Sequence, residues 1–106
     1  MADDIKVADN REAARFEVFL NGKLAGFAKY ILDGDTMILP HTEVDPEHQG
    51  HGLGGHLARF AFDHARDAGL KVIPRCPYMA HYVARHPEVA DLVPTPTPDT
   101  SPTPQD

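Results

Sequence analysis

The chain has 106 residues, of which 42% are hydrophobic and 25% are charged, and this composition is typical of one globular domain with a single core. A formal net charge of −6, from 16 acidic residues against 10 lysines and arginines, argues against nucleic-acid binding. No apolar run approaches the roughly 20 residues that span a membrane, and no signal-peptide pattern opens the sequence. The single cysteine, Cys76, excludes an intramolecular disulfide, so we expect a cytoplasmic protein with no nucleic-acid or membrane partner.

Three strands in meander order are predicted in the first part of the chain. Apolar side chains alternate in the first of them, which is typical of a half-buried strand. Asn21-Gly22 is a strong hairpin signal because both residue types tolerate positive φ, and residues 33–35 make a second turn. Pro46 ends the third strand because proline cannot donate to a ladder. The predicted strands are residues 14–20, 24–32 and 36–44, and a further strand at residues 5–8 has a weaker pattern.

The period of the apolar residues then changes to that of a helix over residues 53–68, and Gly69 is a natural stop just past its end. The apolar stripe consists of Leu53, Leu57, Phe60, Ala61, His64, Ala65 and Ala68. Residues 71–74 are expected to form a short strand, and Pro77 suits the first position of a second helix that reaches Arg85 and ends before Pro87. The predicted order is βββ-α-β-α, an α/β fold with helices packed on a mixed, mainly antiparallel sheet.

The end of the sequence differs from the rest in composition. From Pro94 onward it repeats proline and threonine and has no apolar residue to bury, which predicts a solvated, extended segment. We therefore expect a folded domain over residues 1–93 and a disordered Pro/Thr-rich tail over residues 94–106.

A glycine-rich turn precedes the first predicted helix. Glycines occupy positions 50, 52, 54 and 55, where the third predicted strand leads into the helix. The first N–H groups of a helix lack partners and carry partial positive charge, and glycines let a phosphate approach them closely. We therefore interpret the turn as an anion site. It is neither a Walker loop nor a Rossmann fingerprint, because the Lys-Ser/Thr ending is absent and the strand belongs to an antiparallel meander.

Gln49 to Gly54 match the motif Q/R-x-x-G-x-G/A, and with it the chain resembles the GNAT superfamily of acetyl-CoA-dependent N-acetyltransferases. Residues 41–92 look like the small stand-alone GNAT-like family. The resemblance implies a minimal GNAT-like fold, with acetyl-CoA as cosubstrate. Its pyrophosphate would lie on the backbone N–H groups of the turn and its pantetheine arm along the main chain near Val44. His51 departs from the pattern, since the superfamily often has Arg or Lys there. The implied cofactor-binding residues are Val44, Gln49, Gly50, His51, Gly52, Leu53, Gly54 and Gly55.

Cys76 is the candidate catalytic residue. It precedes Pro77, so we expect it at the N-cap of the second helix, where the helix dipole and the neighbouring Arg75 favour thiolate. The resemblance implies that the acetyl thioester enters near this point and that the small family favours this cysteine as its catalytic group. Cys76 would then accept the acetyl group and pass it on. The alternative is that Cys76 only packs, since free cysteines are among the most buried residue types.

Direct transfer to an amine with a general base is the competing mechanism. His41 and Glu43 share one face of the third predicted strand, although each is more often a surface residue. The strand position that carries a glutamate base in some GNAT enzymes is Ile38 here, which cannot serve. Tyr78 and Tyr82, four apart on the last helix, could line the cofactor groove, protonate a leaving thiolate or pack in the core.

Two functions remain open from the sequence. One is an enzyme that transfers acetyl from acetyl-CoA to an unidentified amine, on a small molecule or a protein lysine. The other is a non-catalytic acyl-CoA-binding or interaction module. No metal is expected, because the seven histidines show no zincin spacing and there is no second cysteine. The chain is expected to be a monomer or a homodimer, the latter because a small sheet exposes its edges.

Overall fold

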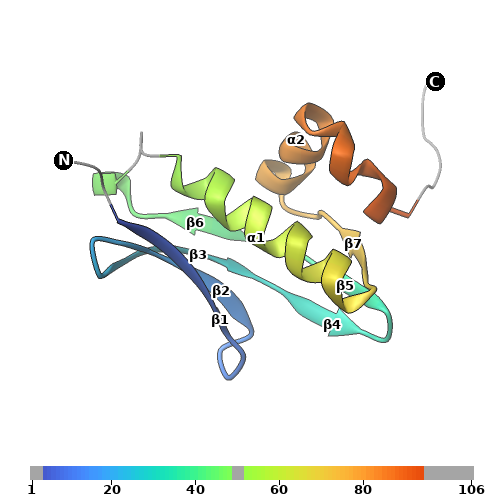
Figure 1. The fold of residues 1–106 in the computed structure, drawn as a ribbon, viewed down its shortest axis with the longest axis horizontal. Helices are drawn as coiled ribbons and strands as arrows, with labels where there is room; N and C mark the ends of the chain where they lie inside the picture. The colour runs from blue at the N-terminus through green and yellow to red at the C-terminus, as the bar shows by residue number, and fades with distance from the viewer. Residues whose placement is uncertain (1–3, 49–51, 95–106) are drawn as a thin grey trace.

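The computed structural model of the chain describes residues 4–48 and 52–94, and Figure 1 shows their arrangement. The strands are β1 (Ile5–Asn10), β2 (Arg15–Leu20), β3 (Lys23–Lys29), β4 (Ile31–Asp33), β5 (Thr36–Ile38), β6 (Thr42–Val44) and β7 (Lys71–Ile73). The helices are α1 (Leu53–Ala68) and α2 (Pro77–Arg85), with the 3₁₀ turns η1 (Pro46–His48) and η2 (Pro87–Leu92).

Four strands form the larger sheet, in the order β1-β2-β3-β6, and every neighbouring pair is antiparallel. β1, which had the weakest sequence pattern, pairs with β2 along its whole length and is longer than predicted. The predicted hairpin between β2 and β3 is confirmed, with a φ of 53° at Asn21 and 84° at Gly22. The smaller sheet has the order β4-β5-β7, and its β5 and β7 are parallel. The sheets are therefore mixed and mainly antiparallel, as predicted.

Two predicted strands are each broken into two, which corrects the prediction of continuous strands over residues 24–32 and 36–44. The first break is at Tyr30, whose buried ring packs on Phe16 with 4.7 Å between centroids and whose hydroxyl donates to Asp9 Oδ1 at 2.7 Å. The second break is at residues 39–41, where Pro40 has no N–H to give to a ladder. Each break moves the chain from one sheet to the other.

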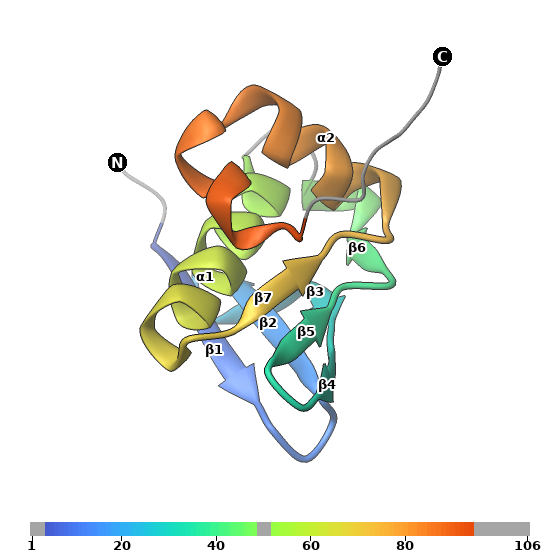
Figure 2. The same cartoon turned by 90° about the vertical axis from the view of Figure 1, so that its right-hand side faces the viewer.

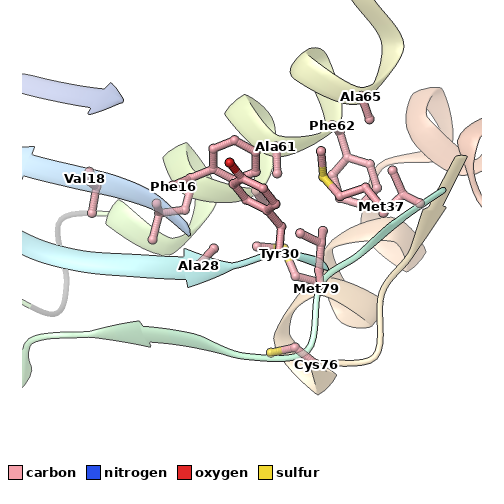
Figure 3. Packing of buried hydrophobic residues seen from close by; sticks show 14 of the residues in the cluster. Phe16, Val18, Ala28, Tyr30, Met37, Ala61, Phe62, Ala65, Cys76 and Met79 are labelled. Carbon is pink, nitrogen blue, oxygen red and sulfur yellow. The ribbon is translucent and has the colours of Figure 1, made fainter. Parts of the chain in front are cut away.

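α1 crosses one face of the larger sheet, and its apolar side chains form the centre of the core (Figure 3). The predicted stripe was wrong at its edges, because Phe62 is fully buried, Phe60 only partly buried and Ala68 exposed. Phe62 is buried because α2 covers that side of the helix, where its ring stacks on Tyr82 at 5.6 Å. The predicted stop at Gly69 is confirmed by its φ of 73°.

α2 and η2 lie beside α1, as Figure 2 shows from the end of the sheets. Arg66 of α1 binds η2 through hydrogen bonds. Its guanidinium donates to both carboxylate oxygens of Asp91, at 3.0 and 2.9 Å, and to the Glu88 carbonyl at 2.9 Å. η2 is thus part of the fold, and it holds α2 in place against α1.

The beginnings of α1 and α2 meet at Gly54. A Cβ atom on Gly54 would lie 2.6 Å from the Tyr78 Oη atom and 2.7 Å from its Cζ atom, closer than van der Waals contact allows. A Cβ atom on the next residue, Gly55, would meet nothing within 4 Å. Only the first of these adjacent glycines is therefore needed for the phenol of Tyr78 to lie over the start of α1.

This contact predicts different outcomes for two neighbouring substitutions. Both Gly54→Ala and Gly55→Ala gain the same helix propensity, up to about 1 kcal/mol. We expect Gly54→Ala to be about 1–2 kcal/mol less stable than Gly55→Ala in urea unfolding, because the new methyl group displaces the Tyr78 ring. In a Tyr78→Ala background the difference should disappear. A difference that survives in that background would show that the contact is not its cause.

Candidate active site

The candidate site lies where the two sheets part. β5 and β7 pair in parallel as far as Ile38 and Ile73, and Leu39 continues this ladder with its N–H on the Ile73 carbonyl at 2.9 Å. The Leu39 carbonyl accepts from the Cys76 N–H, also at 2.9 Å. The His41 carbonyl then accepts from Lys29 of β3. Between Leu39 and His41 the chain therefore changes its partner strand from β7 to β3. We call the place where β6 and β7 diverge the fork.

The inner edge of this fork is open backbone. β6 is the last strand of its sheet, paired only with β3 among the described strands. The Asp45 N–H and the His41 carbonyl point to β3, so by the alternation of an antiparallel pair the polar groups of Thr42 and Val44 point the other way. An extended ligand could pair with them as an added strand. The predicted pairing of a pantetheine arm with the main chain near Val44 requires such an open strand edge.

Cys76 lies at the base of the fork, as the N-cap of α2, where it was predicted (Figure 3). Its side chain is 5% exposed. Burial raises the pKa of the thiol, but hydrogen bonds from the backbone N–H groups of Met79 and Tyr78 at the start of α2 outweigh it, together with Thr42, and the pKa falls below its ordinary value of 9.0. Arg75 is not among the main causes of this lowered pKa.

Thr42 is a site residue that the sequence did not reveal. Its N–H and its hydroxyl lie close enough to the Cys76 sulfur to lower the pKa of the thiol. The geometry at the hydroxyl is nevertheless not that of a formed hydrogen bond, because Oγ1 is buried with no partner among the described residues. A buried hydroxyl without a hydrogen-bond partner is able to donate to a thiolate or to the carbonyl of a ligand in the fork.

His41, just before β6, and Glu43 of β6 lie on the same side of the chain, as predicted, and their side chains contact each other at 3.1 Å. Both are more than half exposed. Because side chains alternate along a strand, this face is opposite to that of Thr42. The structure therefore does not bring either candidate base to the thiol side of β6.

The two candidate tyrosines have different surroundings. Tyr78 lies between Cys76 and Gly54, and burial, followed by the charge of Cys76, raises the pKa of its phenol. It is therefore neutral and able to donate a proton at the fork. Tyr82 is sandwiched between Phe62 and His86, with ring centroids at 5.6 and 3.9 Å, so it has a packing role.

The glycine turn is described only in part, since Gln49, Gly50 and His51 lie outside the described residues. Gly52 is the N-cap of α1, with a left-handed φ of 72°, and among the described residues no side chain caps the helix. The first turn of α1 contains no acidic residue. Leu53 is buried in the core, so only its main chain could face a ligand. The described end of the turn thus presents uncapped N–H groups, which is what an anion site needs.

Among the residues that the structure describes, no group of three histidine, cysteine, aspartate or glutamate side chains is arranged to hold a metal ion. Within the same ranges, no helix has the length and apolar character to cross a membrane.

Comparison with known proteins identifies the family. Residues 15–92 match the family described as GCN5-related N-acetyl-transferase. The chain belongs to this family.

Three proteins illustrate the relationship. This GCN5-related N-acetyltransferase is 33% identical over 89 residues to protein NATD1 of Xenopus tropicalis, across 81% of each chain. A GCN5-like protein from Staphylococcus aureus aligns with a TM-score of 0.62 and 24% identity over 85% of this chain and 86% of that one, so it shares the fold. Protein Rv2747 of Mycobacterium tuberculosis, solved with CoA, aligns with a TM-score of 0.55 and 27% identity over 73% of this chain, which spans 50% of that protein. The predicted resemblance and fold class are confirmed.

The thiol of this GCN5-related N-acetyltransferase provides a test of the fork. We expect Thr42→Val to raise the pKa of Cys76, because the isosteric side chain removes a donor beside the sulfur. The thiolate can be titrated by its ultraviolet absorbance, with Cys76→Ser protein as the blank. Thr36→Val is the matched control, since the Thr36 hydroxyl donates to Asp35. An unchanged pKa in Thr42→Val would mean that the hydroxyl does not act on the thiol.

Proposed function

We propose that this chain is an acetyl-CoA-dependent N-acetyltransferase that passes the acetyl group through Cys76 to an amine. The observation that carries the proposal is the thiol at the fork, with its pKa lowered by the N–H groups of α2 and by Thr42. A nucleophile needs this combination of a stabilised anion and adjacent donors.

Acetyl-CoA fits the fork in two places. The open edge of β6 offers the Thr42 carbonyl and the main chain of Val44 to the amide groups of a pantetheine arm. The uncapped start of α1 at Gly52 offers N–H groups to a pyrophosphate. Family membership and the CoA complex of the Rv2747 structure support the same ligand.

Three residues at the fork have different roles in the proposed reaction. The Cys76 thiolate attacks the acetyl carbonyl, the carbon–sulfur bond to CoA breaks, and Tyr78 is placed to give a proton to the departing CoA thiolate. Thr42 is placed to donate to the carbonyl oxygen as negative charge develops on it. The amine, once it has lost its extra proton to solvent, attacks the acetyl carbon, the bond to Cys76 breaks to give back the thiolate, and the proton that the nitrogen then loses restores Tyr78.

The acceptor is an amine that reaches the fork from outside, either a small molecule or a lysine of a protein. The face of β6 opposite to Thr42 is open to solvent and carries a hollow of about 300 Å³ lined in part by Phe27, Glu43 and Asp45. Its carboxylates would attract a protonated amine. Because the thiol lies on the other side of β6, this face would only draw an acceptor toward the strand, and the amine itself would have to enter the fork to reach Cys76.

A second candidate function is a module that binds acyl-CoA without catalysis. The burial of Cys76, at 5% exposure, favours it, because an inert packed cysteine has the same exposure. The two functions differ in whether acetyl appears on the chain.

Mass spectrometry of the intact protein after incubation with acetyl-CoA separates them. We expect one added acetyl group on Cys76, and its transfer to a polyamine or a lysine peptide. Cys76→Ala should keep CoA binding, measured by calorimetry, and lose transfer by roughly 100-fold or more. Transfer at an unchanged rate in Cys76→Ala would contradict the acetyl-cysteine route, and binding without any acetylation in the unmodified protein would support the module.

A further inference from the structure

β1 forms an open edge of the larger sheet. It is the first strand in the order β1-β2-β3-β6 and, among the described strands, it pairs only with β2 (Figure 1). The Asp4 carbonyl accepts from the Asn21 N–H on the β2 side at 2.7 Å. In an antiparallel pair the backbone groups of successive residues alternate between the two sides of the strand, so every second residue of β1 faces away from β2. These outward residues are Ile5, Val7 and Asp9.

The side chains of β1 border apolar surface at this edge. Ile5 and Val7 are partly buried and pack against the core, whereas Lys6 and Ala8 are exposed on the other face of the strand. A hollow of about 290 Å³ lies between β1 and α1, with Val7 and the partly buried Phe60 in its lining. A further strand with apolar residues at alternate positions would cover this surface and pair with the open backbone.

β1 of a second copy has the pattern that the edge requires. A two-fold axis at Val7 would pair the two strands antiparallel, with Val7 opposite Val7 of the second copy and Ile5 opposite its Asp9. All the outward-facing residues of both strands would then exchange hydrogen bonds. The two Val7 side chains would lie together on the α1 face of the joined sheet, beside the Phe60 side chain of each copy.

The exposed face of the strand supplies opposite charges across the joint. In the same register Lys6 would lie opposite Ala8 of the second copy, and Ala8 pairs with Glu17 of β2. Because Ala8 is small, the Lys6 ammonium is able to reach over it to the Glu17 carboxylate. The hydrogen bonds that Glu17 accepts from Arg15 and Asn10 both end on its Oε2 atom, so its Oε1 atom is available among the described contacts. The two-fold axis repeats this contact, so the charges are self-complementary.

We propose that the open edge of β1 is an interface between two copies of this chain, which pair through β1 about a two-fold axis and form one continuous sheet. β6, with the fork, is at the opposite end of the larger sheet, so both candidate sites stay open. The inference does not depend on the proposed function, because it rests on the strand edge and its side chains alone.

Sedimentation equilibrium over a range of protein concentrations tests the proposal. We expect a reversible dimer with twice the monomer mass, at an ionic strength of about 0.15 M, where repulsion between two chains of charge −6 is largely screened. Lys6→Glu should raise the dissociation constant about 10-fold, because the two-fold axis turns two attractive contacts into repulsive ones. Lys23→Glu is the matched control, since it makes the same charge change at an exposed residue of the inner strand β3, and its effect should be about 2-fold or less.

Two outcomes of this experiment would overturn the inference. One is the monomer mass at every concentration. The other is an equal weakening by Lys6→Glu and Lys23→Glu, because the effect would then be one of net charge and not of the β1 edge.

Amide hydrogen exchange, followed by NMR in the unmodified protein, locates the interface without any substitution. We expect the Val7 and Asp9 amides to exchange slowly in concentrated protein and rapidly in dilute protein. The Lys6 and Ala8 amides should exchange slowly in both, because they bond to β2. A dimer in which the exchange of Val7 does not depend on concentration would place the interface elsewhere and overturn the inference.

Discussion

The hydrogen bonds of Leu39 and His41 determine where the two sheets part, and the candidate site depends on that point. Leu39 exchanges hydrogen bonds with Ile73 and Cys76 on the β7 side, whereas His41 accepts from Lys29 on the β3 side. Pro40, between them, cannot donate in either direction. Because β6 leaves β7 here, its edge stays unpaired, and a ligand strand can take the place of a protein strand.

The same junction sets the chemistry of the thiol. The hydrogen bond from the Cys76 N–H to the Leu39 carbonyl holds Cys76 at the start of α2. The Cys76 sulfur therefore accepts hydrogen bonds from the first N–H groups of that helix. The position of α2 in turn depends on Gly54, which lets the Tyr78 phenol lie over α1, and on Arg66, which fastens η2. Residues far apart in the chain thus bring a thiol, a phenol and an open strand edge together.

The sequence was sufficient for the features that depend on local chemistry. The hairpin at Asn21, the stop at Gly69 and the N-cap at Cys76 each follow from a preference of one or two residues, and the structure has all three. The broken strands, the burial of Phe62 and the role of Thr42 depend on contacts with segments distant in sequence. The alternation of side chains along β6 places Thr42 on the face opposite to Glu43, but it does not predict that Thr42 lies beside Cys76.

We propose that the fork between β6 and β7 receives the thioester arm of acetyl-CoA. Amide NMR during a titration with acetyl-CoA tests it directly. We expect the largest shifts at Thr42 and Val44 and at the start of α2, with β4 and the turn between β1 and β2 unchanged. Saturable binding that leaves the amides of β6 and α2 unchanged would contradict it.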